Sequence, residues 1–393
     1  MGQSSTPVAV APRRRDPLAS LGTTTEQLLC RFTGYGTPFL AVDQAVVESN
    51  IDVVLGITQG RWRPHVKTVK SSWGMQRLLD AGLSHFKAST VEEVECLLTL
   101  GAGDVLLAMP AVGETQHRMA HLAAKFPDQN VSVLVDEPAA LASWHDAALG
   151  VFLDVDTGMH RTGLDVECVA DAAELLSTCT SRGYRFAGVH HYDGHLAGLD
   201  EPRRTELTHR GLSALNQLTV ELARAGYRPP EVVTGGSHTF WPALQHDFAP
   251  EVADVLRVSP GTVVYCDVRS LERLGDVGLR PAVAVVASVI SAPTPGSVTV
   301  DAGLTAIQTD AGRPHAALSG ALSATVGEPA QAHLALEFTD PSEAPPVGSR
   351  VCLVPRHVDT AVCQFDEFVV THDGAVSVHP IDARHHRVLE HHG

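Results

Sequence analysis

Several short polar segments of the chain carry side chains that could do chemistry. The first is Arg63-Pro64-His65-Val66-Lys67-Thr68. A lysine that is partly desolvated can have a lowered pKa, and its neutral amine can then attack a carbonyl carbon. Lys67 therefore meets the requirement for a Schiff-base lysine, although most lysines are solvated surface charges.

Two further polar segments follow apolar runs that predict strands. One runs from Asp154 to Gly163, and in it Arg161 could lie over an anionic oxygen of a cofactor. The alternative is an ordinary turn in which Asp156 or Thr157 caps a helix. The other is His190-His191-Tyr192-Asp193-Gly194-His195. Tyr192 or a neighbouring histidine could contact a cofactor ring, or could be a satisfied polar group in a loop.

The segment Val233-Thr234-Gly235-Gly236-Ser237 ends another apolar run with two glycines and a hydroxyl residue. Consecutive backbone N–H groups in such a turn form a nest that binds phosphate. Thr234, Gly235, Gly236 and Ser237 are therefore candidate phosphate-binding residues. Glycine-rich turns are also common without a ligand, so this pattern alone leaves both interpretations open.

His357-Val358-Asp359 follows an apolar run near the end of the chain. We expect this segment to be extended, so that the side chains at i and i+2 point the same way. An imidazole and a carboxylate on one face can hold a divalent cation, with water or substrate completing its shell. Such pairs are more often surface residues or partners in a hydrogen bond.

The elements that would position these residues alternate regularly from Tyr35 onward. Short apolar runs that predict strands are followed by stretches with helical spacing. The predicted strands are 39–42, 85–88, 105–108, 131–135, 150–155, 186–191 and 232–234. Such units build a parallel sheet, and the fold class that fits is α/β, a (β/α)8 TIM-type barrel with its active site at the carboxyl ends of the strands. A doubly wound open sheet is the structural alternative.

Beyond residue 270 the segments are short, mostly β-branched and separated by glycine and proline, which predicts an antiparallel β-domain. They are 283–291, 297–301, 332–337, 350–354, 367–371 and 375–379. We therefore divide the chain into a leader at 1–34 that is partly disordered or joins the β-domain, a barrel at 35–270 and a C-terminal β-domain at 271–393.

The composition narrows the classes of partner. The formal net charge of -16 disfavours nucleic acid and anionic membrane. No run approaches the roughly 18 apolar residues that a membrane span needs, which predicts a cytoplasmic protein. The seven cysteines are an odd number without paired spacing, which argues against a disulfide framework.

In order and spacing these motifs resemble one family. It is the fold-type III pyridoxal-phosphate family that contains D-threonine aldolase and eukaryotic-type D-serine dehydratase, with an alanine-racemase-like barrel. Arg63–Thr68 matches the Arg-Pro-His-x-Lys-Thr motif in full, which places the Schiff-base lysine at Lys67. The stretch from Val155 to Gly163 matches Val-Asp-x-Gly-x-x-Arg-x-Gly, and Thr234–Gly236 matches the Thr-Gly-Gly phosphate loop.

The resemblance implies a role for each of these residues. The implied catalytic residues are Lys67, His65 and Arg161. Pyridoxal 5'-phosphate would be bound by Lys67, Arg161, Tyr192, Thr234, Gly235, Gly236, Ser237 and Tyr265, the last matched through Pro260-Gly261 and Asp267. The metal pair of the family is His-x-Cys in the dehydratases and His-x-Asp in the aldolases. His357 and Asp359 therefore fall on the aldolase side, where Mn²⁺ or Mg²⁺ is favoured and Zn²⁺ stays possible.

We therefore expect a lyase that cleaves a D-β-hydroxy-α-amino acid of the D-threonine kind to glycine and an aldehyde by a retro-aldol reaction. The alternatives are a D-serine or D-threonine dehydratase on the same scaffold, an amino-acid racemase or epimerase, and a non-catalytic pyridoxal-phosphate-binding protein. The resemblance also implies a homodimer with shared active sites.

Two stretches depart from the family pattern. Asp301-Ala302-Gly303-Leu304-Thr305-Ala306 replaces Asp-Ala-Gly-Ser-Lys-Ala. The Ser-Glu-Glu-His-Gly stretch expected near Leu336–Thr339 is largely absent. Both departures fall in the domain that would close the site, so they bear on the substrate and the reaction rather than on the cofactor.

Overall fold

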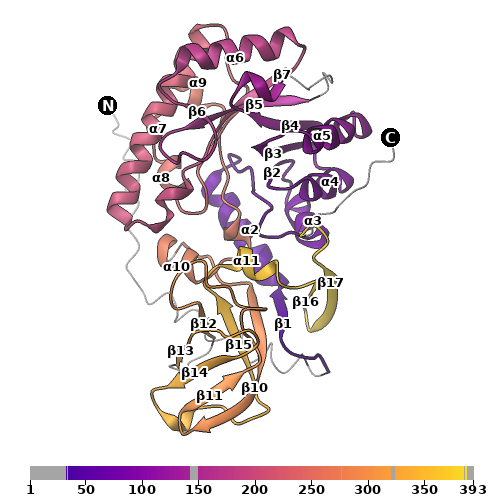
Figure 1. Ribbon diagram of the computed structural model, residues 1–393, viewed down its shortest axis with the longest axis vertical. Helices are drawn as coiled ribbons and strands as arrows, with labels where there is room; N and C mark the ends of the chain where they lie inside the picture. Colours follow the sequence, from indigo (N-terminus) through magenta and orange to yellow (C-terminus); the bar gives the residue numbers. More distant parts are fainter. Residues whose placement is uncertain are drawn as a thin grey trace, which may run out of the picture.

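The computed structural model describes residues 32, 34–141, 149–275, 277–319, 324–384 and 386. These residues form a ring of parallel strands wrapped by helices and, beside it, a β-rich part, which lie at the top and bottom of Figure 1. The leader predicted at 1–34 lies almost wholly outside the described residues.

The ring confirms the predicted barrel. Its hydrogen-bonded order is β2 (His85–Ala88), β3 (Asp104–Pro110), β4 (Asn130–Val135), β5 (Gly150–Asp156), β7 (Arg185–His191), β8 (Val232–Thr234) and β9 (Leu256–Val258), with the short β6 (Leu164–Asp165) beside β5. Residues 61–66 join the two ends, because Trp62 pairs in parallel with Val258 and His65 pairs in parallel with Lys87. These pairings close the ring and exclude the open-sheet alternative.

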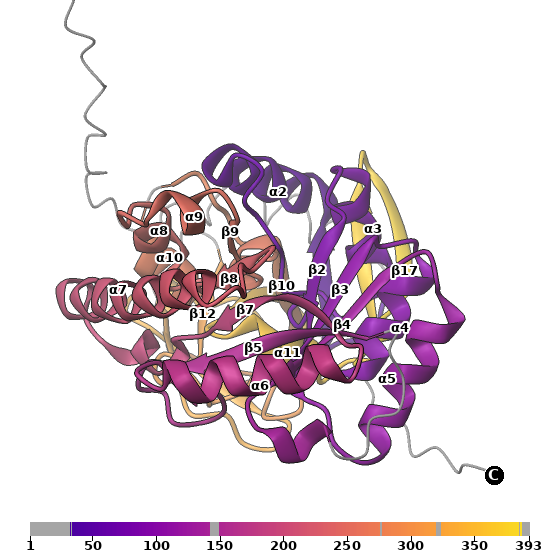
Figure 2. The same ribbon diagram turned by 90° about the horizontal axis from the view of Figure 1, so that it is seen from above.

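Helices surround the ring, as the view from above shows (Figure 2). They are α2 (Gln44–Thr58), α3 (Ser72–Asp80), α4 (Val91–Thr99), α5 (Glu114–Lys125), α6 (Val169–Ser181), α7 (Glu201–Arg224), α8 (Phe240–Leu244) and α9 (Pro250–Ala253). Polar side chains cap the first three, since Asp43, Ser71 and Thr90 each accept a hydrogen bond from an N–H of the first turn. Such caps satisfy amides that a helix leaves unpaired, which fixes where each helix begins after its strand.

The second sheet is the predicted β-domain with one addition. Its path is β13 (Ala324–Val326), β14 (Leu334–Phe338), β11 (Ser297–Val300), β10 (Val283–Thr294), β1 (Phe39–Asp43), β16 (Glu367–His372) and β17 (Ala375–Pro380), with β15 (Arg350–Pro355) beside β10 and β12 (Ala316–Leu318) beside β15. Short helices α10 (Val268–Leu274) and α11 (Val358–Val362) lie where this sheet meets the barrel (Figure 1).

Strand β1 corrects the predicted domain boundary at residue 35. We expected the apolar run at 39–42 to be a barrel strand, but β1 pairs antiparallel with β10 and parallel with β16. The β-domain is therefore not purely antiparallel. An apolar run shows that a strand is buried and does not show which sheet supplies its neighbours. Because β1 leads directly into α2, the first strand of the chain ties the β-domain to the barrel.

Arg63, the first residue of the lysine motif, is part of the barrel interior. Its side chain is fully buried and forms ion pairs with Asp104 of β3 and with Glu231, whose Oε2 lies 2.7 Å from Arg63 Nη1. Its guanidinium also lies 5.3 Å from the centre of the Phe152 ring, in a cluster of apolar side chains from the barrel strands. A buried charge is stable only when it is paired, so Arg63 is a structural residue that links distant strands.

We expect Glu231→Gln to lower the free energy of unfolding by about 3 kcal/mol, because it leaves the buried charge of Arg63 half-compensated. Although burial raises the pKa of Glu231, Arg63 and its other partners lower it to about 2 from an ordinary 4.5. The difference in free energy of unfolding between the wild type and the variant is therefore largest above pH 4.5 and disappears as the pH falls toward 2. Urea unfolding at several pH values measures it, with the exposed Glu206→Gln as a control that should change little.

Among the described residues, no helix is both long enough and apolar enough to cross a membrane.

Candidate active site

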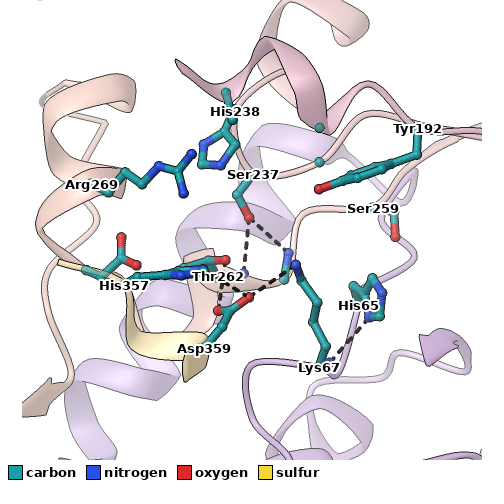
Figure 3. Close-up of a pocket in the computed structure, with 15 residues that line it drawn as sticks. His65, Lys67, Tyr192, Ser237, His238, Ser259, Thr262, Arg269, His357 and Asp359 are labelled. Atoms are coloured by element: carbon teal, nitrogen blue, oxygen red, sulfur yellow. Dashed lines mark hydrogen bonds and ion pairs between the residues drawn. The ribbon is translucent and has the colours of Figure 1, made fainter. Parts of the chain in front are cut away.

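A pocket of about 150 Å³ lies at the carboxyl ends of the barrel strands, next to the β-domain. Figure 3 shows the side chains that surround it. The structure places seven of the predicted site residues in its lining: His65, Lys67, Tyr192, Gly236, Ser237, His357 and Asp359. The polar segments singled out in the sequence therefore do converge on one site, from both parts of the fold.

Lys67 follows the extended segment that closes the barrel. Its Nζ lies 3.2 Å from Asp359 Oδ2, and the negative charge of that carboxylate raises the pKa of Lys67. The lowered pKa that we expected from desolvation is therefore wrong, because Asp359 outweighs burial. Burial instead lowers the pKa of another lysine, Lys87, to about 7, but Lys87 does not line the pocket.

Asp359 is held in place by hydroxyl groups of the barrel. Its Oδ1 accepts hydrogen bonds from Thr68 Oγ1 at 2.6 Å and from Thr262 Oγ1 at 3.2 Å. Its Oδ2 is buried and has no hydrogen bond among the described residues. The neighbours of Oδ2 are Lys67 Nζ and, at 3.7 Å, His357 Nε2. One oxygen of the carboxylate therefore positions the group, while the other is left to meet charges in the pocket.

We had expected both His357 and Asp359 to have extended backbones, but only His357 does. His357 has extended backbone angles and precedes α11, whereas Asp359 lies in the first turn of that helix. The side chains converge all the same, because His357 Nδ1 contacts Asp310 Oδ2 at 2.5 Å, which leaves Nε2 on the side of Asp359. Burial lowers the pKa of His357, but Asp359 and Asp310 raise it to about 9.

This arrangement fits a divalent cation. An imidazole nitrogen and an unsatisfied carboxylate oxygen face each other, and a second carboxylate orients the imidazole from behind, as it does in many metal sites. No cluster of three or more His, Cys, Asp or Glu side chains that could hold a metal occurs in the part of the chain that the structure describes. The protein would therefore supply two ligands, and water or substrate the others.

The turn at Ser237 is hydrogen-bonded differently from the predicted phosphate nest. Ser237 Oγ accepts hydrogen bonds from the backbone N–H groups of Gly261 at 3.2 Å and Thr262 at 3.1 Å. The N–H of Gly236 is bound by Thr239 Oγ1 at 3.1 Å. The amides of Gly261 and Thr262 therefore converge on the Ser237 hydroxyl, which lines the pocket and can donate its own hydrogen to an anion there.

Gly261 is also required for the close approach of this turn to the lysine segment. A Cβ atom at Gly261 would lie 2.3 Å from the carbonyl oxygen of His65. No real Cβ comes so close to a backbone oxygen, so only glycine lets the turn pack against the segment that carries Lys67. The Gly261 turn and the lysine segment are thereby held together by backbone contact.

Tyr192 forms one wall of the pocket, packed against Gly236 (Figure 3). Lys87 Nζ lies 5.4 Å and Arg161 Cζ lies 5.1 Å from the centre of its ring. Arg161 is exposed and does not line the pocket, so it touches the site only through Tyr192. Asp156 accepts hydrogen bonds from three backbone N–H groups at residues 158–160, so it organises a turn there, but it does not cap a helix as the alternative supposed, because α6 begins only at Val169.

Three other predicted cofactor-binding residues do not line the pocket. Thr234 is fully buried, with its hydroxyl 2.8 Å from His191 Nδ1, and Gly235 packs against Phe240. Tyr265 is fully buried, and its hydroxyl donates to the carbonyl of Val69 at 3.4 Å. The structure gives Tyr265 a place in the core rather than beside the cofactor site.

Several lining residues were not predicted from the sequence. They are Gly194, Ala197, His238, Ser259, Gly261, Thr262, Asp267 and Arg269, and Thr68 lies behind Asp359. Four of them, within residues 259–267, belong to the stretch between β9 and α10. Strand β9 was itself not predicted, so the turn after it could not be placed at the carboxyl edge of the barrel. A prediction of strand β9 would have placed the residues that follow it at the carboxyl edge of the barrel, next to the pocket.

The family follows from comparison with known proteins. Residues 42–268 match the model of the alanine racemase N-terminal domain, and residues 282–371 match a serine dehydratase domain. The first match covers more than half of the chain, so this protein belongs to the alanine racemase N-terminal domain family. Its fold is that of the fold-type III pyridoxal-phosphate enzymes.

Individual relatives extend the likeness across both domains. The chain is 26% identical over 353 residues to the D-threonine aldolase of an Arthrobacter species, covering 86% of this chain and 90% of the relative. It is 27% identical over 352 residues to the D-threo-3-hydroxyaspartate dehydratase of a Delftia species, covering 80% and 88%. The crystal structure of the D-threonine aldolase from Filomicrobium marinum superposes with a TM-score of 0.79 at 25% identity, covering 89% of this chain and 96% of that one.

Proposed function

We propose that this protein is a lyase dependent on pyridoxal phosphate and a divalent metal, which cleaves a D-β-hydroxy-α-amino acid of the D-threonine kind to glycine and an aldehyde. The observation that carries the proposal is the meeting of Lys67, the His357–Asp359 pair and the turn at Ser237 in one pocket. Lys67 supplies an amine for a carbonyl cofactor, Ser237 a hydroxyl for its phosphate, and His357 with Asp359 two ligands for a cation, a set of groups that fits chemistry at a substrate hydroxyl.

Lys67 would hold the cofactor as a Schiff base, and the Ser237 hydroxyl, oriented by the N–H groups of Gly261 and Thr262, would donate to its phosphate. When bound, the cofactor supplies an electron sink for the bond that breaks at the substrate's α-carbon. A cation on His357 Nε2 and Asp359 Oδ2 would act as a Lewis acid toward the β-hydroxyl, and Mn²⁺ or Mg²⁺ suits the carboxylate, with Zn²⁺ also accepted.

Two groups of this chain are placed to move protons in the pocket. Burial, with the positive charges of Lys87 and Lys67, holds the pKa of His65 well below its usual value, so its imidazole is neutral and carries its proton on Nε2, which can donate. Its Nδ1 accepts the backbone N–H of Lys67 at 3.3 Å, which fixes the ring. Asp359 raises the pKa of Lys67, so the free amine of Lys67 is protonated there and can donate that proton in the pocket. Tyr192 would cover the cofactor and exclude water from one side.

The reaction type rests on the second metal donor. A carboxylate at Asp359, rather than a thiolate, favours cleavage of the bond between the α- and β-carbons over loss of the hydroxyl. The dehydratase alternative uses the same residues, with Lys67 removing the α-proton. We include in the proposal a homodimer in which the β-domain of one subunit caps the barrel of the other.

Product analysis tests the proposal directly. The purified protein is incubated with pyridoxal phosphate, D-threonine or D-serine, and Mn²⁺ or Zn²⁺, and glycine, aldehyde and ammonia are measured. We expect glycine and acetaldehyde in equal amounts from D-threonine, and no activity when the metal is chelated. Ammonia with a keto acid would establish the dehydratase instead, and turnover of L-threonine at the same rate would contradict the D-configuration.

A further inference from the structure

Arg269 is a cation without a counter-charge in the wall of the pocket. It is the second residue of α10, and its backbone N–H donates to the carbonyl of Arg356 at 3.3 Å, which places it beside His357. Its guanidinium makes no hydrogen bond or ion pair with any residue that the structure describes. Arginine offers five donors in a rigid fork, so an unpaired arginine that lines a pocket is suited to bind an anion there.

The residues around Arg269 do not neutralise it. Both carboxylate oxygens of Asp267 accept backbone N–H groups, from Ser270 at 2.7 Å and from Val358 at 3.1 Å. Glu272 is held by Arg356 through two contacts at 2.9 and 2.7 Å. The nearby acidic groups are thus already engaged, although the chain as a whole carries an excess of negative charge.

More positive charge lies behind Arg269. Arg273 Nη1 lies 3.0 Å from His238 Nδ1, and His238 lines the pocket next to Arg269. Burial and the charges of Arg269 and Arg204 lower the pKa of Arg273 to about 10, and burial with Arg273 and Arg269 lowers the pKa of His238. This wall therefore carries several cationic groups, and its one lining carboxylate, Asp267, is bound by backbone N–H groups rather than by Arg269.

The position of Arg269 indicates which anion it meets. In Figure 3, Arg269, His238 and His357 lie on one side of the pocket, and Tyr192 and His65 on the other. The substrate nitrogen would take the place of Lys67 Nζ on the cofactor, and the β-hydroxyl would face His357 and Asp359. The substituent on the β-carbon is then the part of the substrate next to Arg269, whereas the α-carboxylate branches from the carbon nearer Lys67.

We propose that Arg269 is a specificity-determining residue that binds a carboxylate on the β-carbon, so that the preferred substrate is a D-3-hydroxyaspartate rather than D-threonine. The inference rests on the proposed function. In the reaction the bond between the α- and β-carbons breaks, the β-hydroxyl loses its proton and becomes the aldehyde of glyoxylate, and the α-carbon takes up a proton to give glycine. With D-threonine, a methyl group would face an unpaired guanidinium and leave it without a partner.

The test compares kcat/KM for D-3-hydroxyaspartate and D-threonine in the wild type, Arg269→Met and Arg269→Lys. We expect the wild type to prefer D-3-hydroxyaspartate by at least about 10²-fold, and Arg269→Met to lose that preference because kcat/KM falls much more with D-3-hydroxyaspartate than with D-threonine. Arg269→Lys should recover part of it, because it restores the charge without the fork. The exposed Arg203→Met, on α7, is the matched control and should behave as the wild type.

A binding measurement gives a readout that does not depend on turnover. Calorimetry on the protein loaded with cofactor should show that succinate, with two carboxylates, binds more tightly than butyrate to the wild type and equally weakly to Arg269→Met. Loss of the cofactor absorbance in Arg269→Met would assign Arg269 to the phosphate, and an equal loss of rate with both substrates would assign it to the α-carboxylate; either overturns the proposal.

Failure of this inference can be told from failure of the proposed function. If the wild type binds the cofactor and cleaves D-threonine but shows no preference for D-3-hydroxyaspartate, only the role of Arg269 falls. If no lysine-bound cofactor forms and neither substrate is cleaved, both fall.

Discussion

Replacing Lys67 by alanine is expected to remove the visible absorbance of the lysine-bound cofactor and to lower kcat by at least about 10³-fold, since the group that forms the covalent bond is lost. The side chain is partly exposed in the pocket and ends at Asp359, so its loss leaves the barrel core untouched. Ultraviolet-visible spectra of the purified variant with added pyridoxal phosphate measure the first effect, and product formation measures the second.

Two other lysines serve as controls. Lys70 is mostly buried, with its Nζ 2.6 Å from Glu93 Oε1, so it has a structural ion pair and is not available to a cofactor. Lys87 is the sharper comparison, because burial gives it a pKa of about 7 and its amine would be the more readily neutral of the two candidates. Its Nζ, however, lies against the Tyr192 ring and 3.5 Å from His190 Nε2, outside the pocket lining.

We therefore expect Lys87→Met to keep the absorbance that Lys67→Ala abolishes. The opposite pattern, in which Lys67→Ala keeps the band and Lys87→Met loses it, would mean that the low pKa of an amine matters more here than its access to the pocket. Reduction with borohydride followed by peptide mapping identifies the modified lysine independently of the spectra.

Part of the pocket lining could be predicted from the sequence because residues that follow parallel barrel strands lie at the same end of the barrel. Tyr192 and Ser237 each follow a predicted strand of a parallel barrel, and the carboxyl ends of such strands meet at one face. Strand prediction from short apolar runs was therefore enough to bring these two residues together, whereas Lys67 follows no predicted strand and was placed by its motif. The predicted convergence did not depend on any side-chain detail.

Side-chain directions could not be predicted in the same way. Tyr265 follows the single turn at Thr262–Val264, and that turn directs its ring into the core instead of the pocket. Arg161 lies in a loop organised by Asp156, and the loop leaves the arginine at the surface against Tyr192. Motif spacing fixes the order of residues along the chain, whereas a turn of three or four residues decides which way each side chain points.

Long-range pairings were the other limit. Strand β1 lies about 240 residues from β10 and about 330 from β16 along the chain, and an apolar run carries no information about such partners. Arg269 was missed for a related reason, because it lies in the connection between the two domains. From the sequence alone, a charged residue in such a connection is expected at the surface. Only the structure shows that Arg269 lines the pocket together with His357 and His238.

Replacing Asp359 by asparagine is expected to abolish the dependence on metal and to lower kcat/KM by about 10²- to 10³-fold, while the cofactor absorbance remains. Asparagine has nearly the same shape and can still accept the hydrogen bond from Thr68 through its amide oxygen. The substitution removes the anionic Oδ2, which is the proposed metal ligand and the carboxylate oxygen that has no hydrogen bond among the described residues. Metal titrations followed by initial rates, and spectra of the same samples, measure the two effects separately.

Two companion variants separate metal binding from simple disruption. Asp310→Asn removes the carboxylate behind His357 and should weaken metal affinity by about 10- to 100-fold without abolishing activity at saturating metal. Asp359→Cys restores an anionic but softer donor, so activity should return more with Zn²⁺ than with Mn²⁺. If Asp359→Asn kept its metal dependence while Asp310→Asn lost it, the cation would be bound on the Asp310 side of His357, and the pairing of His357 Nε2 with Asp359 would instead be a means of positioning Lys67.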